Sequence, residues 1–187
     1  MKETNIAVVL GLGKSLALYG KEKRFIKKHI TIGVNNIFDY YPTDYLIIID
    51  RKCRFNKKRL STIMQSRPKE LLTFIDEYSD HPCFKKIELA PSRSNIKYIE
   101  TKYCYSVMSP YVAIIHAYKL GCKNIILYGV DLTNHKELSP VLNQVKKDLV
   151  NLQQYLNLKG VKIYTRNNNS PLTDVIEYAP LDKLLFL

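Results

Sequence analysis

Residues 109–134, SPYVAIIHAYKLGCKNIILYGVDLTN, decide the fold. Ser109 is a residue type that caps helices, and Pro110 suits a first helical turn. Apolar side chains then recur at helical spacing as far as Leu120. Gly121 follows, where a helix end needs a residue free to adopt a positive φ. The first half of the stretch therefore predicts a helix over 109–120.

The second half of the stretch predicts a buried strand. Residues 124–129, NIILYG, form an almost uninterrupted apolar run, as expected of a parallel strand covered on both faces. The run ends at Gly129, and Asp131 follows two residues later. Ligands bind at the carboxyl ends of strands in open α/β sheets. This segment therefore predicts both the architecture and the edge of the sheet at which the protein works.

Similar apolar runs alternate with helical patterns along the rest of the chain. Strands are expected at 5–10, 29–34, 44–50, 70–75, 124–129 and 161–165, with weaker candidates at 84–89 and 96–100. Helices are expected at 14–20, 56–66, 109–120 and 140–158, with a short one near 170–178. The alternation predicts an α/β protein with a Rossmann-like, mostly parallel, twisted sheet of about six to seven strands and helices on both faces. We expect one domain over 1–187, with 66–105 as an irregular insertion covering one side of the site.

Composition fits this class. The 187 residues are 46% hydrophobic and 25% charged, which is ordinary for a soluble globular domain. No apolar run reaches the ~18 residues of a membrane span, and the first residues do not form a signal peptide, so we expect a cytoplasmic protein. The four cysteines show neither CxxC pairing nor zinc-ligand spacing to a histidine. This indicates thiols in a reducing compartment and no metal site.

The net charge of +12 comes largely from two basic runs, 21–29 and 51–59. Such a surface attracts nucleic acid, an anionic membrane or phosphate-bearing small molecules. The alternative is a set of solvated helix faces. Because the run at 51–59 directly follows the strand at 44–50, we expect it at the same sheet edge as Asp131.

The first strand runs into a glycine-containing loop. Gly11 and Gly13 would let the backbone approach a ligand, while Lys14 adds a charge and Ser15 a hydroxyl. The loop is not GxGxxG, because Leu16 occupies the third glycine position, and its spacing is not that of a P-loop. It predicts either a phosphate-binding loop or a simple turn.

Polar residues also end the second and third strands. Asn35 and Asn36 follow the second strand, and Asp50 ends the third. Their side chains suit ribose hydroxyls or base edges. The alternatives are turn chemistry for the asparagines, and a helix cap or a partner for Arg51 in the case of Asp50.

Among the four histidines, His135 is the candidate catalytic base, since it lies four residues beyond Asp131. An exposed loop histidine is the alternative. His116 lies inside the predicted helix over 109–120 and is expected to be packed or at the surface rather than reactive.

With these positions assembled, the chain resembles the bacterial sialyltransferases of glycosyltransferase family 42, and more distantly the pterin-diphosphokinase-like nucleotide-binding proteins. Three blocks carry the resemblance: VVLGLGKSL (8–16), SPYVAIIHAYKLGCKNIILYGVDL (109–132) and KIYTRNNNSPLTDVIEYAP (162–180). They cover both ends of the chain and most of the predicted sheet.

The resemblance implies a site for a CMP-activated sugar, with no metal and no other cofactor. The positions that it places around the nucleotide are Gly11, Gly13, Ser15, Asn35, Ser109, Gly129, Asn169 and Ser170. Asp131 would lie at the floor of this site or shape the loop above it. We add Lys14 and Asp50 to the nucleotide-binding candidates from the positions described above.

The sequence also departs from the family's pattern. Leu12 stands where the family has asparagine, and Pro110 where it has glycine. Asp50 replaces an asparagine, Thr133 a tyrosine that steadies the leaving phosphate, and Ser106 an arginine before the helix.

The family's long lid, which carries its general-base histidine, is nearly absent here. The approximate histidine position holds Asn143 or Gln144, so His135 is the base that the sequence offers.

Two functions follow from these observations. One is a nucleotide- or nucleotide-sugar-binding protein of sialyltransferase-like type, acting as a metal-independent glycosyltransferase. The other is a catalytically inactive structural or interaction protein in a larger assembly, with the apolar tail 181–187 contacting a homo-oligomer or protein partner. Binding of non-specific nucleic acid is a third hypothesis that rests on charge alone.

Overall fold

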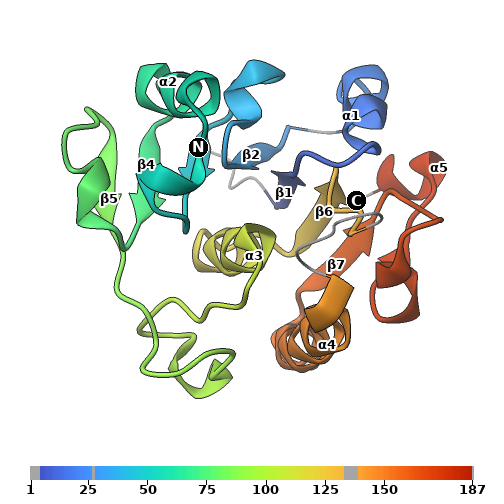
Figure 1. The fold of residues 1–187 in the computed structure, drawn as a ribbon. Helices are drawn as coiled ribbons and strands as arrows, with labels where there is room; N and C mark the ends of the chain where they lie inside the picture. Colours follow the sequence, from blue (N-terminus) through green and yellow to red (C-terminus); the bar gives the residue numbers. More distant parts are fainter. Residues whose placement is uncertain (1–4, 27, 133–138, 187) are drawn as a thin grey trace.

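The fold is a single parallel sheet between two layers of helices (Figure 1). The structure is a computed structural model that describes residues 5–26, 28–132 and 139–186. Eight strands form the sheet in the order β5-β4-β3-β2-β1-β6-β7-β8, and every neighbouring pair is parallel. Their bounds are β1 Ile6–Leu10, β2 Ile30–Val34, β3 Tyr45–Ile47, β4 Glu70–Thr73, β5 Phe84–Lys86, β6 Asn124–Tyr128, β7 Lys162–Thr165 and β8 Glu177–Tyr178.

The strand order reverses its direction beside β1. Strands β2 to β5 follow one another on one side of β1, whereas β6 returns to its other side and β7 and β8 continue outward. In the register, Leu10 lies opposite both Gly33 of β2 and Tyr128 of β6. Such a reversal opens a crevice at the carboxyl ends of the strands, where ligands bind in this class of fold.

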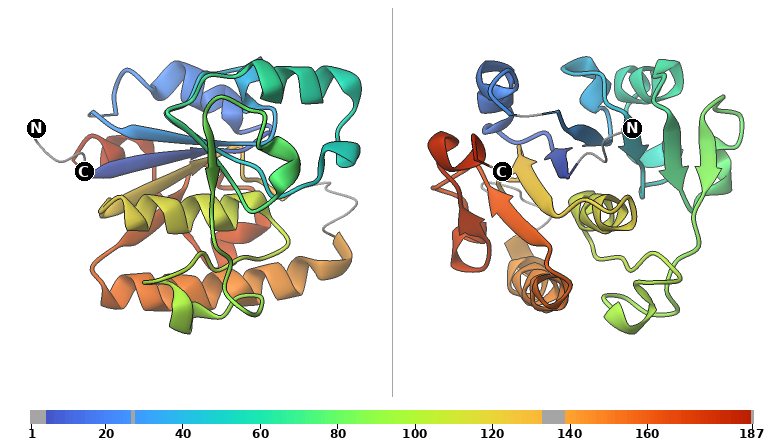
Figure 2. Two further views of the ribbon diagram at one scale, coloured as in Figure 1. Left: turned by 90° about the vertical axis from the view of Figure 1, so that its left-hand side faces the viewer. Right: turned by 180° about the vertical axis from the view of Figure 1, so that it is seen from behind.

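Helices cover both faces of the sheet, as Figure 2 shows from the side. On one face lie α3 (Ser109–Lys119) and α4 (Leu142–Leu158); on the other lie α1 (Leu16–Glu22), α2 (Lys57–Gln65) and α5 (Leu181–Leu184). Successive side chains of a strand point to opposite faces, so β6 feeds both apolar cores. Ile125 and Leu127 pack in the core under α3 and α4, while Ile126 and Tyr128 pack in the other.

The α/β class with a parallel sheet, predicted from the sequence, is confirmed. The sheet has eight strands, because the weaker candidate at 84–89 contributes β5 and the two-residue β8 adds an edge. The predicted strand at 96–100 is wrong: Ile96–Tyr98 is a 3-10 helix. Ile99 is fully buried but Tyr98 is exposed, and the three-residue spacing of Ile96 and Ile99 suits a tight helical turn.

Two further expectations need correction. The short helix near 170–178 is a 3-10 helix at Pro171–Asp174 followed by β8. Ser109 does not cap α3; it is the first helical residue, and Met108 occupies the cap position without a side-chain hydrogen bond. Pro110 does stand in the first turn, where its missing N–H costs no intrahelical hydrogen bond.

The end of α3 forms as the sequence predicts. Gly121 has φ +83°, and its N–H donates to the carbonyl of Tyr118 at 2.9 Å. The N–H of Cys122 donates to the carbonyl of Ala117 at 3.2 Å. This pair of hydrogen bonds is a Schellman motif. It turns the chain directly into β6.

The region 66–105 contributes β4 and β5 to the sheet and then leaves it. Beyond β5 it contains an isolated bridge between Leu89 and Tyr103 and the 3-10 helix at Ile96–Tyr98, and Arg93 pairs with Asp148 on α4.

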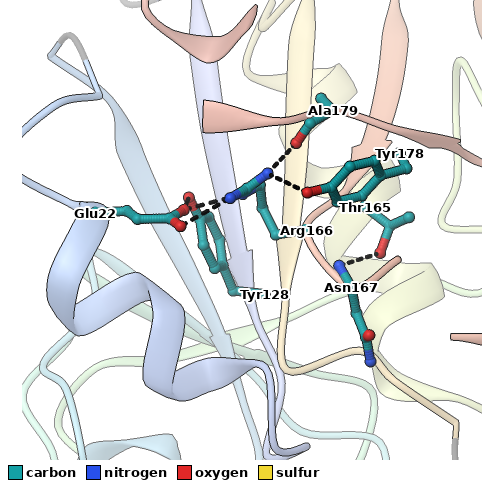
Figure 3. A network of polar contacts seen from close by, with 7 residues as sticks. All are labelled: Glu22, Tyr128, Thr165, Arg166, Asn167, Tyr178 and Ala179. Atoms are coloured by element: carbon teal, nitrogen blue, oxygen red, sulfur yellow. Dashed lines mark hydrogen bonds and ion pairs between the residues drawn. The ribbon is translucent and has the colours of Figure 1, made fainter. Parts of the chain in front are cut away.

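A buried ion pair joins α1 to the segment that follows β7 (Figure 3). Arg166, just after β7, donates from Nε and Nη2 to the two carboxylate oxygens of Glu22 at 2.9 and 2.7 Å. Tyr128 donates its hydroxyl to the same carboxylate at 2.8 Å, and Arg166 also donates to the carbonyl of Ala179. Glu22 and Arg166 are 8% and 6% exposed, so neither charge is solvated by bulk water. The network ties α1, β6, β7 and the segment after β8 together.

Replacing Glu22 by Gln should lower the free energy of unfolding by about 3–5 kcal/mol, because it leaves the buried Arg166 charge without its partner. Urea denaturation followed by circular dichroism measures this. Glu88→Gln is the matched control, since Glu88 pairs with Lys102 at the surface; its change should stay within about 0.5 kcal/mol. Equal effects of the two substitutions would contradict a stabilising role for the buried pair.

Candidate functional site

A cavity of about 850 Å³ lies at the carboxyl ends of β1, β2, β3 and β6. This is the edge where the strand order reverses, and the volume falls within the range of small-molecule sites. Its described lining comes from six parts of the chain: 11–14, 34–36, Tyr40, 50–59, 107–110 and 129–132, of which the fourth contributes Asp50, Cys53, Arg54, Phe55 and Arg59.

The floor of the cavity is formed by two glycine loops that touch. The N–H of Gly13 donates to the carbonyl of Gly129 at 2.8 Å, and Gly129 has φ +66°. A Cβ on Gly11 would lie 2.3 Å from the Gly129 oxygen, and a Cβ on Gly13 would lie 2.6 Å from an oxygen of Asp131. No side chain fits between these loops. The glycines after β1 thus serve close backbone packing, and the same packing leaves the loop surface open to a ligand.

Asp131 and Ser15 fasten the two loops together. The N–H of Ser15 donates to Asp131 Oδ2 at 2.8 Å, and the Ser15 hydroxyl donates to Asp131 Oδ1. That hydroxyl accepts the N–H of Gly129 at 2.8 Å. Asp131 is 4% exposed and Ser15 8%. Of the two roles expected for Asp131, the geometry therefore favours shaping the loop, although the residue also borders the cavity.

The two candidates from the third sequence block lie differently. Ser170 is buried and donates its hydroxyl to the backbone carbonyl of Asp131 at 2.7 Å, so it supports the β6 loop from behind. Asn169 is exposed, and its N–H donates to the side chain of Asn167 at 3.0 Å. Neither residue is among those that line the cavity.

Asn35 and Ser109 form the opposite wall. Asn35 adopts φ +54°, a conformation that asparagine tolerates better than most residues. Its amide oxygen lies 3.5 Å from the Ser109 hydroxyl at the start of α3. The amide and the hydroxyl therefore face the same space, together with the N-terminal end of an 11-residue helix and its partial positive charge. The place of Asn35 after the second strand indicated it as a site residue, and the resemblance placed both residues around the nucleotide; their contact was not predicted.

The basic run at 51–59 reaches the cavity, as expected from its place after the third strand. Arg54 and Arg59 line one side, and Lys14 lines another. Asp50 also lines the cavity, and its backbone carbonyl accepts the Tyr78 hydroxyl at 2.9 Å. Arg51 turns away to pair with Glu77. The other basic run, 21–29, contributes no described residue to the lining.

Sequence reasoning missed the apolar part of the lining. Tyr40, Phe55, Val107 and Met108 border the cavity. Phe55 stands inside the basic run, and an aromatic residue among cations after a strand is the signal that could have indicated it. Val107 and Tyr40 are 41% and 63% exposed. In the sequence, no pattern distinguishes these two residues from other aliphatic and aromatic residues at the surface.

No histidine is among the described residues that line the cavity. His135 lies outside the described residues, as does Thr133. His116 is confirmed as a packed residue: it is 4% exposed, and burial lowers its pKa to about 4. Its Nδ1 lies 2.9 Å from the Tyr103 hydroxyl. It is therefore neutral at physiological pH and plays no part in the site.

A buried carboxylate on α4 positions the segment that enters the cavity. Asp148, 1% exposed, accepts hydrogen bonds from Ser106 at 2.5 Å, Gln144 at 2.8 Å and Arg93 at 3.0 Å. Burial raises the pKa of Asp148, but the hydrogen bonds, led by that of Ser106, outweigh this and the pKa is lowered. Because Ser106 precedes the lining residues 107–110, this contact fixes their wall of the cavity.

Replacing Ser15 by Ala should destabilise the fold by about 2–4 kcal/mol, because it leaves the Gly129 N–H and one Asp131 oxygen buried without partners. Chemical denaturation measures the loss. Ser61→Ala on the exposed face of α2 is the matched control and should change stability by no more than about 0.5 kcal/mol. A Ser15→Ala protein as stable as the control would contradict the fastening role.

Replacing Asp148 by Asn should cost about 1–3 kcal/mol at pH 7. Because the folded-state pKa of Asp148 lies below its unfolded value, this stabilisation is present above the unfolded pKa of ~3.9 and is lost as the pH falls through the folded value. Denaturation curves at pH 7 and pH 3 should show the wild type and the variant converging at low pH. Asp76→Asn, which alters an exposed pair with Lys86, is the control and should show no such convergence.

Within the described part of the chain, no helix has the length and apolar character needed to cross a membrane. The same residues contain no group of three or more His, Cys, Asp or Glu side chains placed to hold a metal ion.

Comparison with known proteins supports the resemblance at the level of the fold. No protein-family model and no curated protein matches the sequence. Among solved structures, the sialyltransferase CstII from Campylobacter jejuni in complex with the substrate analogue CMP-3FNeuAc is similar with a TM-score of 0.58 and 18% identity, covering 94% of this chain and 85% of that one. The monofunctional alpha-2,3-sialyltransferase Cst-I from Campylobacter jejuni is similar with a TM-score of 0.61 and 17% identity, covering 97% of this chain and 82% of that one. An alpha-2,3-sialyltransferase from the same organism, in apo form, is similar with a TM-score of 0.60 and 18% identity, covering 97% of this chain and 82% of that one. The chain therefore has the α/β fold of these bacterial sialyltransferases over nearly its whole length.

Proposed function

We propose that this protein binds a cytidine nucleotide or CMP-activated sugar in the cavity at the carboxyl edge of the sheet. The observation that carries the proposal is the meeting of the β1 loop, the β6 loop and the start of α3 at one cavity where the strand order reverses. One solved structure of similar fold holds CMP-3FNeuAc and another is a complex with CMP.

The lining residues suit different parts of the nucleotide according to their chemistry. Lys14 on the β1 loop and the N-terminal end of α3 suit a phosphate. The N–H groups of Gly11 and Gly13 already donate to the carbonyls of Tyr128 and Gly129, so these two glycines shape the loop instead. Asn35 and Asp50 offer an amide and a carboxylate to ribose hydroxyls or to the base. Ser15, Asp131 and Ser170 hold the loops in place through the hydrogen bonds given above. Asn169 does not line the cavity and therefore plays no part in binding.

Glycosyl transfer at this site would break the bond between the sugar and the phosphate oxygen, and CMP would leave carrying the bond's electron pair. The acceptor oxygen attacks the sugar carbon and gives up its proton. Lys14 offsets the charge that develops on the leaving phosphate. His135 is the base that we assign to the acceptor proton, because its ordinary pKa is near neutrality and it follows the β6 loop.

A catalytically inactive protein of the same fold is the second candidate. Three observations favour it: no described histidine lines the cavity, Pro110 removes an N–H from the start of α3, and Leu185 and Phe186 are 40% and 84% exposed near the end of the chain. The absence of a described histidine and the N–H lost at Pro110 both weaken stabilisation of the transition state. The third offers an apolar contact for a partner.

Isothermal titration with CMP, UMP and AMP tests nucleotide binding. Asn35→Gly removes the amide while keeping a residue that accepts φ +54°, so it should weaken CMP affinity about tenfold without unfolding the protein. Ser94→Gly is the matched control, because Ser94 also has a positive φ of 53° and does not line the cavity. Absence of CMP binding in the wild type, or equal affinities of the two variants, would contradict the proposed site.

Turnover separates the two candidates. Incubation with CMP-sialic acid, followed by chromatography of released CMP, should show hydrolysis or transfer that His135→Ala lowers at least tenfold. CMP binding without release of CMP would favour the inactive protein.

A further inference from the structure

The α2 side of the cavity carries an arginine whose guanidinium is fixed in place. Arg59 donates from Nε to the side-chain oxygen of Asn36 at 2.7 Å, and its guanidinium lies 5.0 Å from the centre of the Phe55 ring. All three residues line the cavity. An arginine held by a hydrogen bond and an aromatic face loses little conformational freedom when it binds a ligand.

A chain of hydrogen bonds sets the direction of this contact. Asn36 is 7% exposed and donates its amide N–H to Asp39 at 2.6 Å. Asp39 in turn accepts the Thr62 hydroxyl at 2.6 Å, and the hydrogen bonds from Thr62 and Asn36 lower its pKa. Because Asp39 accepts from the amide nitrogen, the amide oxygen of Asn36 is turned toward Arg59. Residues from η1 (Ile37–Asp39) and α2 thus hold the guanidinium at the cavity wall.

The Arg59 guanidinium makes no direct ion pair with a described carboxylate, although its charge also contributes to lowering the pKa of Asp39. Its Nε bonds a neutral amide, and no described Asp or Glu oxygen lies within 4.0 Å of the guanidinium. The two terminal nitrogens make no hydrogen bond to a described residue. They form the planar pair of donors that matches the two oxygens of a carboxylate or phosphate. The nearby Arg54 adds positive potential at the same wall.

The position of Arg59 separates it from the phosphate loops. The elements that hold Arg59 follow β2 and β3, which lie one and two strands from β1 in the sheet. At an interstrand spacing of ~4.8 Å, these elements start about 5 and 10 Å from the β1 loop. Arg59 is therefore held on the β2 and β3 side of the cavity, whereas Lys14 lies on the β1 loop.

We propose that Arg59 is a second oxyanion subsite of the cavity, which binds a phosphate or carboxylate group on the molecule that shares the cavity with the nucleotide. The inference rests on the proposed function, because it takes the β1 loop as the place of the nucleotide phosphate. It narrows the second substrate to molecules that carry an anionic group. Arg59 is thereby a specificity-determining residue rather than a part of the reacting centre.

Titration with inorganic phosphate and with acetate tests the subsite, using NMR of the arginine Nε–H signals in the full-length protein. We expect phosphate, acetate or both to shift the Arg59 signal with a millimolar Kd, and the shift to persist when CMP is saturating. The two titrations distinguish a phosphate-selective from a carboxylate-selective subsite. Arg59→Gln should weaken this binding at least tenfold, and Arg59→Lys should retain part of the phosphate affinity but lose the acetate affinity, since the two-donor fork is gone.

Lys57→Gln is the matched control, because Lys57 is exposed on the first turn of α2 and does not line the cavity. Anion affinity unchanged in Arg59→Gln, or phosphate displaced from Arg59 by CMP, would overturn the proposal. Failure of the proposed function is a different result: CMP then does not bind, while phosphate titrated without nucleotide still reports whether Arg59 holds an oxyanion. Thermal unfolding of each variant confirms that a lost signal is not lost folding.

Discussion

The contact between the β1 and β6 loops is the constraint on which the rest of the site depends. The two backbones approach so closely at Gly11, Gly13 and Gly129 that no Cβ fits between them. Ser15 and Asp131 then close the contact with three hydrogen bonds in a buried setting. Two adjacent strands are therefore fixed relative to each other at the edge where the sheet opens. Any ligand at this edge meets a floor whose shape is already set.

The walls of the cavity are positioned by polar contacts that lie outside it. Asp148 on α4 holds the segment entering α3 through Ser106, and Asp39 holds Asn36 and thereby Arg59. In each case a carboxylate one step removed from the cavity orients a neutral polar side chain. The lining can thus present backbone, amides and cations with few acidic groups facing the ligand. This arrangement suits anionic molecules, and it is consistent with a net charge of +12 concentrated partly beside the site.

Local patterns in the sequence predicted the parts of the fold that local chemistry decides. Apolar runs indicated the central strands, Gly121 the end of α3, and polar residues after strands the working edge. The two-residue β8 carries no pattern of its own, because an edge strand that short forms only once β7 is in place. The fastening role of Asp131 depends on Ser15, 116 residues away, and the pairing of Arg59 with Asn36 depends on packing of α2 against the sheet. The tertiary fold brings such partners together, so the spacing of these residues in the sequence does not predict their contacts.

The place of β1 in the middle of the sheet has a consequence for how the chain is made. β1 pairs with β2 early in the sequence, but its other neighbour, β6, begins only at Asn124. In the same way, Glu22 on α1 pairs with Arg166, which is synthesised much later. At ribosomal rates of about 5–20 residues per second, β1 is exposed along one edge for roughly 10 s before β6 emerges. A nascent chain arrested before β6 presents an apolar strand edge, and Glu22 has neither Tyr128 nor Arg166 to pair with. The protein is therefore a poor candidate for stepwise folding during translation, and its central strand is the element that a chaperone would have to shield.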